Sequence, residues 1–276
     1  MQHACDNWFV AFFEGALIIL IMVRIIKAMR GSIPFIRRIP GLNAIDEAIG
    51  RATEMGKPIL MIPGILGLDI VSLQALNVFT HVTRTAARFA TPIRMCVCDA
   101  TLYTISQEVI QDAYQAEGKP ELYDPDSVRF LSDQQFAFAA SVAGLIQREQ
   151  VAATFFLGSF FAESLIFAEV ANSVGAIQVA GTVMTTQTPF FIAACDYVII
   201  GDEFYAASAY LSKEPVATGS LVGQDYAKLL LTFFIVLGSI IYTVTGYAGG
   251  PHVPLIHTLF ADGGWTALLL SIRHLF

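Results

Sequence analysis

Charged residues are scarce in this chain of 276 residues, because only 14% are Asp, Glu, Lys or Arg, against about 25% in an ordinary soluble domain. The 16 basic residues are outnumbered by 23 acidic ones, and the formal net charge is −7. This balance excludes a typical nucleic-acid binder, which needs a basic surface for phosphates. The hydrophobic share of 55% excludes a disordered chain. A mean hydropathy of +0.61 requires membrane segments, an unusually apolar globular part, or both.

Cysteine and histidine are also rare, and this limits the available chemistry. Four cysteines are too few and too scattered for a disulfide framework, and Cys96 and Cys98 lack the CxxC spacing of redox or zinc sites. We expect buried, reduced thiols in a reducing compartment. His81 is the only histidine in residues 43–218, so a Ser-His-Asp triad would have to use it. We expect it to be an ordinary helix residue.

Sequence motifs of known chemistry are missing as well. No GxGxxG follows an expected strand, Gly64 and Gly67 have the wrong spacing, and neither Gly-Lys-Pro segment is a Walker A end. HExxH and GxSxG are absent. These absences favour a protein without catalytic activity and without a metal site, although an enzyme stays open as an alternative. They identify no cofactor.

Two long apolar runs are typical of membrane helices. Trp8 to Val23 contains only Glu14 as a charged residue, and five basic residues follow within residues 24–38. The positive-inside rule then places the N-terminus outside and makes the run an uncleaved anchor. The second run, Leu229 to Tyr247, contains no charge. A third segment, 253–272, is either a further span or an interfacial or re-entrant hairpin, because it contains polar groups.

These runs divide the chain into five parts. We predict an N-terminal anchor (1–30), a basic juxtamembrane linker (31–42), a cytoplasmic domain (43–218), a second transmembrane helix (219–248) and a C-terminal hairpin or third span (249–276). The domain contains 19 acidic and 9 basic residues, a balance of −10, whereas residues 24–42 carry five positive charges and no negative one. The basic residues at 24–42 are favoured beside anionic lipid head groups. We expect the protein in the cell (inner) membrane.

Strand-like runs alternate with helical patterns inside the domain. We expect strands at 58–62, 93–98, 152–157, 176–179 and 197–200, a first helix capped by Asn43 and ended by Gly56, and helices at about 70–90, 103–117, 132–149, 160–173 and 203–212. Strict alternation favours a parallel sheet covered on both faces. The predicted fold class is α/β, a Rossmann-like parallel sheet in a cytoplasmic domain flanked by transmembrane helices.

Small and polar residues stand where the expected strands end, at Pro63-Gly64, Asp99, Gly158-Ser159, Gly181-Thr182 and Gly201-Asp202-Glu203. Ligands of such sheets bind at these carboxyl ends. The candidate ligand-binding residues are Asp99, Ser159, Glu163, Thr182, Asp202 and Glu203, for a nucleotide-like or anionic metabolite. The same residue types form helix caps and tight turns in any α/β protein, so both interpretations stay open.

The segment 155–182 is rich in Phe and Ala, and residues 203–215 repeat the mixture of small and aromatic side chains. This composition indicates either a deep core or a subunit interface. The expected partners are the lipid bilayer and further copies of the chain, with other subunits of a membrane complex as an additional possibility and nucleic acid excluded.

Four stretches, at 44–60, 155–169, 175–182 and 194–212 (AIDEAIGRATEMGKPIL, FFLGSFFAESLIFAE, GAIQVAGT and ACDYVIIGDEFYAASAYLS), carry a resemblance to a known family. The chain resembles an uncharacterised prokaryotic membrane-protein family, a domain of unknown function with a cytoplasmic α/β domain between transmembrane helices. The resemblance runs from about Ile39 to beyond Lys228. It implies membrane location and this domain arrangement, and no activity.

Three functions are consistent with these sequence features. The first is a membrane-anchored, non-catalytic scaffold or assembly subunit that forms homo-oligomers through its α/β domain. The second is a small-ligand binding module or enzyme that uses the crevice at the strand ends. The third is a channel or transporter subunit built around Glu14 and the segment 253–272.

Overall fold

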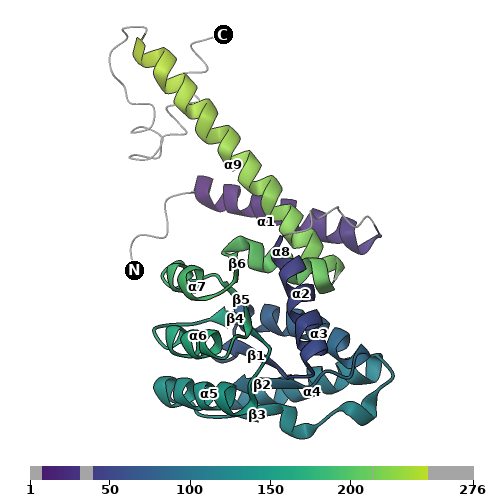
Figure 1. Cartoon of the computed structure of the whole chain (residues 1–276). Coiled ribbons are helices and arrows are strands. Elements are labelled where there is room, and N and C mark those ends of the chain that lie inside the picture. The colour runs from purple at the N-terminus through teal and green to yellow at the C-terminus, as the bar shows by residue number, and fades with distance from the viewer. Residues whose placement is uncertain (1–7, 32–39, 213, 248–276) are drawn as a thin grey trace. The chain divides into compact units, whose positions relative to one another are not determined.

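The computed structural model describes residues 8–31, 40–212 and 214–247, which belong to two compact units (Figure 1). The larger unit, Phe35–Glu214, contains the sheet. The smaller one joins Met1–Pro34 to Pro215–Phe276. The predicted hairpin or third span at 249–276 and most of the linker at 31–42 lie outside the described residues.

Six parallel strands form one sheet in the larger unit, in the order β3-β2-β1-β4-β5-β6. The strands are β1 (Ile59–Gly64), β2 (Ile93–Val97), β3 (Val128–Phe130), β4 (Ala153–Ser159), β5 (Ile177–Thr182) and β6 (Tyr197–Ile200). This order is that of a Rossmann-like doubly wound sheet, so the predicted α/β class is confirmed. The chain changes direction across the sheet between β1 and β4.

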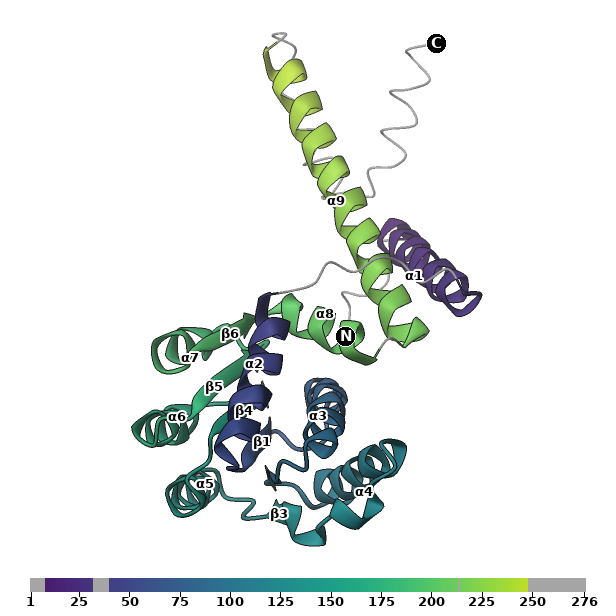
Figure 2. The same ribbon diagram turned by 45° about the vertical axis from the view of Figure 1, so that its right-hand side comes forward.

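Helices cover both faces of the sheet (Figures 1 and 2). One face carries α2 (Pro40–Met55), α3 (Ile70–Arg88), α4 (Ala100–Ala116) and α8 (Asp202–Ser212), and the other carries α5 (Gln135–Glu149), α6 (Ser164–Ser173) and α7 (Thr188–Ala194). Two 3₁₀ turns, η1 (Pro120–Leu122) and η2 (Pro125–Ser127), precede β3. Parallel strands need such crossover helices, which protect both faces from water.

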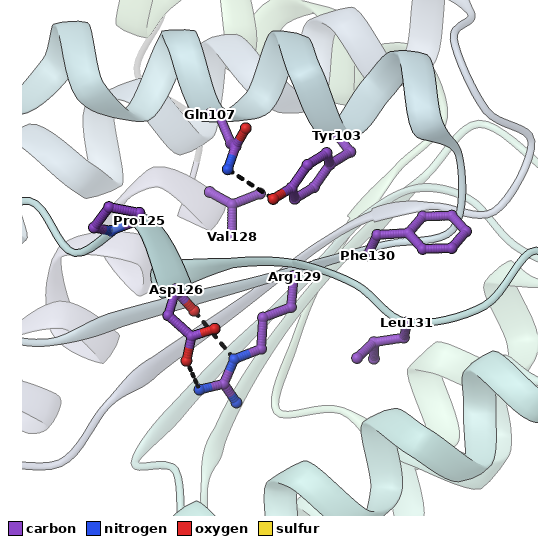
Figure 3. A pocket seen from close by; sticks show the side chains of 8 residues that line it. All are labelled: Tyr103, Gln107, Pro125, Asp126, Val128, Arg129, Phe130 and Leu131. Atoms are coloured by element: carbon purple, nitrogen blue, oxygen red, sulfur yellow. Dashed lines mark hydrogen bonds and ion pairs between the residues drawn. The ribbon is translucent and has the colours of Figure 1, made fainter.

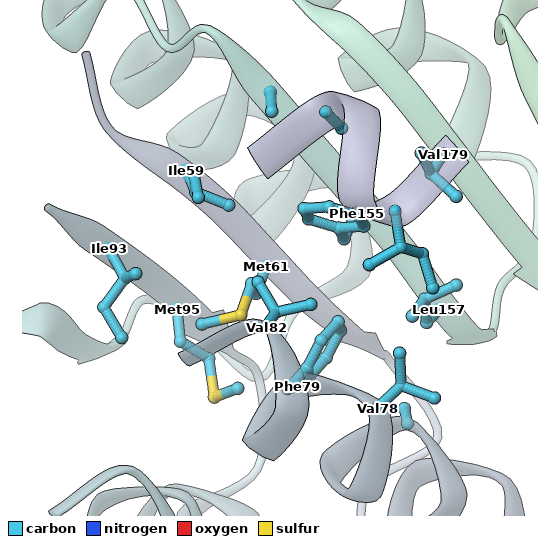
Figure 4. Close-up of a cluster of buried hydrophobic side chains, with 14 of the residues drawn as sticks. Ile59, Met61, Val78, Phe79, Val82, Ile93, Met95, Phe155, Leu157 and Val179 are labelled. Atoms are coloured by element: carbon cyan, nitrogen blue, oxygen red, sulfur yellow. The ribbon is translucent and has the colours of Figure 1, made fainter. Parts of the chain in front are cut away.

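Each face of the sheet has its own apolar core, because neighbouring strand residues point to opposite sides. Phe155 packs in the core shared with Phe79 of α3 (Figure 4), whereas the adjacent Phe156 packs in the core under α5–α7. There the Phe156 and Phe167 rings lie 4.9 Å apart. The Phe- and Ala-rich segment therefore supplies much of the domain core, and the alternative of a subunit interface is not needed to explain its composition.

Several predicted boundaries were wrong. The first helix begins at Pro40, before Asn43, because proline is well tolerated in the first turn of a helix. The strand β3 and the helix α7 were missed, since three and seven residues are too short to show a period. Three strands end two or three residues later than predicted: β1 ends at Gly64, β4 at Ser159 and β5 at Thr182.

The smaller unit contains α1 (Trp8–Met29) and α9 (Pro215–Tyr247). Only α9 is, among the described residues, long and apolar enough to cross a membrane, over Pro215–Ile241 with a mean hydropathy of 1.5. The helix α1 carries Glu14, Arg24 and Lys27 within its 22 residues and does not match that composition. The structure therefore supports one candidate span where the sequence predicted two flanking ones.

Two glycines one turn apart let α1 and α9 approach closely. A Cβ on Gly219 would lie 2.8 Å from the Ile25 Cα, and one on Gly223 would lie 3.0 Å from the Ile21 Cα. Further along, the rings of Phe13 and Phe234 have centroids 6.3 Å apart. Contacts that move toward the start of α1 as they move along α9 make the two helices antiparallel. This spacing of small residues is the one that membrane helix pairs use for close packing.

Candidate functional site

The carboxyl edge of the sheet between β1 and β4 is where Rossmann-like proteins bind ligands. The residues at this edge come from the β1–α3 loop (65–69) and from the β4–α6 connection (160–163). Four of the six predicted residues, Asp99, Ser159, Glu163 and Thr182, follow or end a strand at this edge, and Asp202 and Glu203 begin α8 after β6.

The backbone closes the gap between the ends of β1 and β4. The Ile65 N–H donates to the Ser159 carbonyl oxygen at 2.9 Å. A Cβ on Gly64 would lie 2.6 Å from the Ser159 nitrogen, and one on Gly158 would overlap the Pro63 carbonyl oxygen. Both glycines have positive φ, +93° and +148°, which other residues rarely adopt. The two strand ends therefore touch where a dinucleotide-binding protein keeps room for a pyrophosphate.

The N-terminus of α3, which binds phosphate in nucleotide-binding relatives of this fold, is already occupied by a carboxylate. The Ser72 N–H donates to Asp69 Oδ1 at 2.6 Å, and the Asp69 N–H donates to Ser72 Oγ at 2.8 Å. Ser159 Oγ lies 3.4 Å from the other carboxylate oxygen of Asp69. This capping box satisfies the helix end and places a negative charge there. An anion would be repelled from this position.

Asp69 was not among the predicted site residues, although Asp69 and Ser72 carry a signal for it. An Asp followed three residues later by Ser, just before an apolar helical pattern, is a variant of the capping box. The structure brings Asp69 to Ser159, and it also places Tyr205 of α8 close by. Burial raises the pKa of Tyr205, and the carboxylates of Asp69 and Asp202 add to the shift.

Asp99 caps α4, since the Leu102 N–H donates to its Oδ2 at 2.8 Å. A Cβ on Gly67 would come within 3.4 Å of the Asp99 carboxyl carbon, so the β1–α3 loop lies against this side chain. Asp99 therefore forms the helix cap that its position after a strand suggested. It lies next to the switch point, the place between β1 and β4 where the chain changes direction across the sheet.

Glu163 is fully buried and joins the β4–α6 connection to α5. Its Oε2 accepts from Gln135 Nε2 at 2.5 Å and its Oε1 accepts from the Phe161 N–H at 2.8 Å. The adjacent Ser164 Oγ lies 3.3 Å from Gln187 Oε1. Both carboxylate oxygens are therefore engaged by protein donors, which favours a role in holding the β4–α6 connection to α5.

Cys98, at the end of β2, is not an activated nucleophile. Burial raises the pKa of Cys98 to about 11, and the negative charges of Asp99 and Glu163 add to the shift. Its Sγ lies 3.7 Å from the Gly64 carbonyl oxygen, to which the thiol donates. A thiol with this pKa stays protonated at neutral pH, and the thiolate is the reactive form.

The remaining predicted residues lie on the β5–β6 side. Thr182 is buried, and its Oγ1 accepts from the Met184 N–H at 3.2 Å, while its carbonyl accepts from the Gly201 N–H at 3.2 Å. Asp202 and Glu203 are exposed in the first turn of α8. The six predicted residues thus lie along one edge of the sheet.

The charged residues in the loops at this edge are all acidic. The loops that leave the strands, at 65–69, 98–99, 131–134, 160–163, 183–187 and 201, contain no Lys, Arg or His. Within the part of the chain that the structure describes, no group of three or more His, Cys, Asp or Glu side chains could hold a metal ion. These loops therefore offer no cationic side chain to a phosphate or a carboxylate ligand.

Apolar side chains, in contrast, are displayed at this edge. Leu66, Leu68, Ile70 and Leu73, which we call the β1–α3 patch, are 52%, 46%, 70% and 43% exposed. A single exposed Leu needs no explanation, but a run of four on one loop and the first turn of its helix does. Such a patch is typical of a protein interface.

Two hollows lie away from the switch point. One, of about 660 Å³, lies beside β3 and is lined by Tyr103 and Gln107 of α4 and by residues of β3, whose Arg129 points away from α4 (Figure 3). Arg129 is already paired there with Asp126 at 2.6 Å and with Glu149 at 2.9 Å. The other, of about 190 Å³, lies between α3 and Leu211, Ser212 and Glu214 and includes His81, which the structure confirms as a helix residue.

Comparison with known families gives one match. Residues 3–251 match the model of a family described as a domain of unknown function (DUF6754). No curated protein matches the chain.

Proposed function

The chain belongs to this family of unknown function, and from its own geometry we propose that it is a membrane-anchored, non-catalytic assembly subunit that self-associates through the β1–α3 patch of its α/β domain. The observation that carries the proposal is the character of the carboxyl edge of the sheet. It is closed by backbone contacts, it is lined by carboxylates without a cation, and it displays four exposed apolar side chains.

The proposed anchor consists of α9 together with α1. The uncharged stretch Leu229 to Tyr247 lies within α9, and α1 packs against α9 in the opposite direction through Gly219 and Gly223. In this proposal the apolar part of α1 before Arg24 enters the bilayer beside α9 and runs in the opposite direction. The basic residues that follow Val23 favour a cytoplasmic α/β domain and an outside N-terminus.

A second copy of the chain is the proposed occupant of the β1–α3 patch. The flanking carboxylates of Asp69 and Asp99 disfavour contact with an anionic membrane surface, so the patch suits a protein partner. Anchoring confines all copies to one plane and raises their effective concentration. Each partly exposed Leu or Ile that becomes buried contributes about 1 kcal/mol, so a patch of four suffices for association between anchored copies.

The test measures the copy number of the full chain in lipid nanodiscs by mass photometry. We expect an oligomer for the natural sequence, and a shift to fewer copies for Leu66→Asp and for Ile70→Asp, because each would bury a charge without a partner. Met55→Asp is the matched control, since Met55 is 44% exposed at the end of α2, away from the patch.

A chain that is monomeric at every protein-to-lipid ratio would refute self-association. Equal shifts in Met55→Asp and Leu66→Asp would refute the role of this patch. A rise in melting temperature with nucleotides or metabolites that is lost in Asp99→Ala would instead support a ligand site at the strand ends.

A further inference from the structure

An arginine stacked on a tyrosine joins α1 to α9 at the beginning of the apolar run of α9. The Arg24 Cζ lies 3.7 Å from the centroid of the Tyr226 ring, within the smaller compact unit. The stack positions the guanidinium by contact with its flat face. Its N–H groups point outward in the plane of the guanidinium, and no hydrogen bond or ion pair joins Arg24 to any residue in the described ranges.

Neighbouring residues make this position positively charged. Lys27 lies one turn after Arg24 on the same side of α1 and is exposed, and no ion pair to it is present among the described residues. Asp225 precedes Tyr226 in sequence, and no ion pair joins it to Arg24 in the described part of the chain. The cations of α1 therefore remain available to a ligand.

The antiparallel pairing also fixes the level of these residues along α9. Ile25 of α1 meets Gly219, and Arg24 meets Tyr226, three residues before the uncharged stretch that starts at Leu229. Within the candidate span Pro215–Ile241, Asp225 and Lys228 are charged and the residues from Leu229 on are not. If the hydrocarbon core begins at Leu229 for that reason, Arg24 and Tyr226 lie at its boundary. Tyrosine and arginine are both enriched at that depth, beside the lipid phosphates.

We propose that Arg24, Lys27 and Tyr226 form a binding site for the phosphate group of an anionic phospholipid. The free N–H edge of Arg24 donates two parallel hydrogen bonds to phosphate oxygens, Lys27 adds a second positive charge, and the Tyr226 ring keeps the guanidinium in position. The site goes beyond the proposed assembly function and rests on its membrane-anchoring part alone. Inorganic phosphate offers the same chemistry, so the test separates the two sources.

The experiment uses the full chain in nanodiscs that contain phosphatidylglycerol and phosphatidylcholine, followed by native mass spectrometry of the released protein with its retained lipids. We expect retention of phosphatidylglycerol in preference to phosphatidylcholine. Arg24→Gln should weaken retention about tenfold, as expected for the loss of one charge-assisted bidentate contact. Arg24→Lys should weaken it about threefold, because the charge remains and the paired donors do not.

Arg51→Gln removes the same charge from the surface of α2 and should leave lipid retention unchanged. Tyr226→Leu keeps an apolar side chain and removes the stacking ring, and it should weaken retention less than Arg24→Gln does. Equal retention in Arg24→Gln and Arg51→Gln would overturn the proposal, as would equal binding of both lipids. A helical circular dichroism spectrum matching that of the natural chain confirms that each variant is folded.

Two further readouts separate this site from the proposed function. If millimolar inorganic phosphate displaces the lipid and binds in its place, the site belongs to free phosphate and the proposed lipid ligand is refuted. The same spectra report the copy number. A monomer that still retains phosphatidylglycerol through Arg24 would refute self-association and support the lipid site. An oligomer without lipid preference would support self-association and refute the lipid site.

Discussion

Replacing Gly158 by alanine tests the closure of the switch point, on which the argument against a bound nucleotide depends. Gly158 has a φ of +148°, and a Cβ there would overlap the Pro63 carbonyl oxygen. The backbone strain of such a conformation costs about 1–3 kcal/mol for a residue other than glycine, and the overlap adds about 1–3 kcal/mol. We therefore expect a loss of about 2–6 kcal/mol, out of the roughly 5–15 kcal/mol that stabilise a typical domain.

Two other glycines provide controls for the same substitution. Gly175 also has a positive φ, +73°, but a Cβ would meet nothing within 4 Å, so Gly175→Ala should cost about 1 kcal/mol from strain alone. Gly50 lies within α2 with open space around it, and Gly50→Ala should stabilise by up to about 1 kcal/mol.

The assay is thermal unfolding of the full chain in detergent, followed by fluorescence. A change of 1 kcal/mol shifts the melting temperature of a domain this size by about 2–4 °C. Gly158→Ala should therefore melt about 10 °C below the natural chain and well below Gly175→Ala. Equal melting temperatures for Gly158→Ala and Gly175→Ala would refute the close contact between the ends of β1 and β4.

Two further predictions concern the carboxylates. Glu163→Ala leaves the Gln135 amide and the Phe161 N–H without an acceptor, so it should lower the free energy of unfolding in urea by about 2–4 kcal/mol. Glu163→Gln keeps one acceptor and should lose less stability. Equal losses in the two variants would contradict the role of these hydrogen bonds. The hydrogen bond from Arg129 holds the pKa of Asp126 below its ordinary value of 3.8, so its stabilising contribution is present above about pH 4 and is lost as the pH falls through the lower folded-state value. Melting temperatures of the natural chain and Asp126→Asn should therefore differ slightly at pH 7 and converge on acidification, and a constant difference would contradict the ion pair.

Local patterns in the sequence predicted much of the domain. The strand at 197–200 has the predicted bounds, His81 lies in the predicted helix, and Asp99 caps the helix that follows it. Alternating apolar runs, helical periods and capping residues depend on neighbours in the chain, so they can be recognised without the fold. Where the local signal was short, as at β3 and α7, the prediction failed.

The sequence alone determined the parallel α/β class and the long apolar run of α9, because both follow from the order and spacing of apolar residues. Only the tertiary structure decided what lies at the carboxyl edge. The contact between Asp69 and Ser159 joins residues 90 positions apart, and the stack of Arg24 on Tyr226 joins opposite ends of the chain. Such contacts depend on strand order and helix pairing, which bring distant segments together through space. The scarcity of cations was visible from the start, but the fold shows that the edge where a Rossmann-like protein would use them has none.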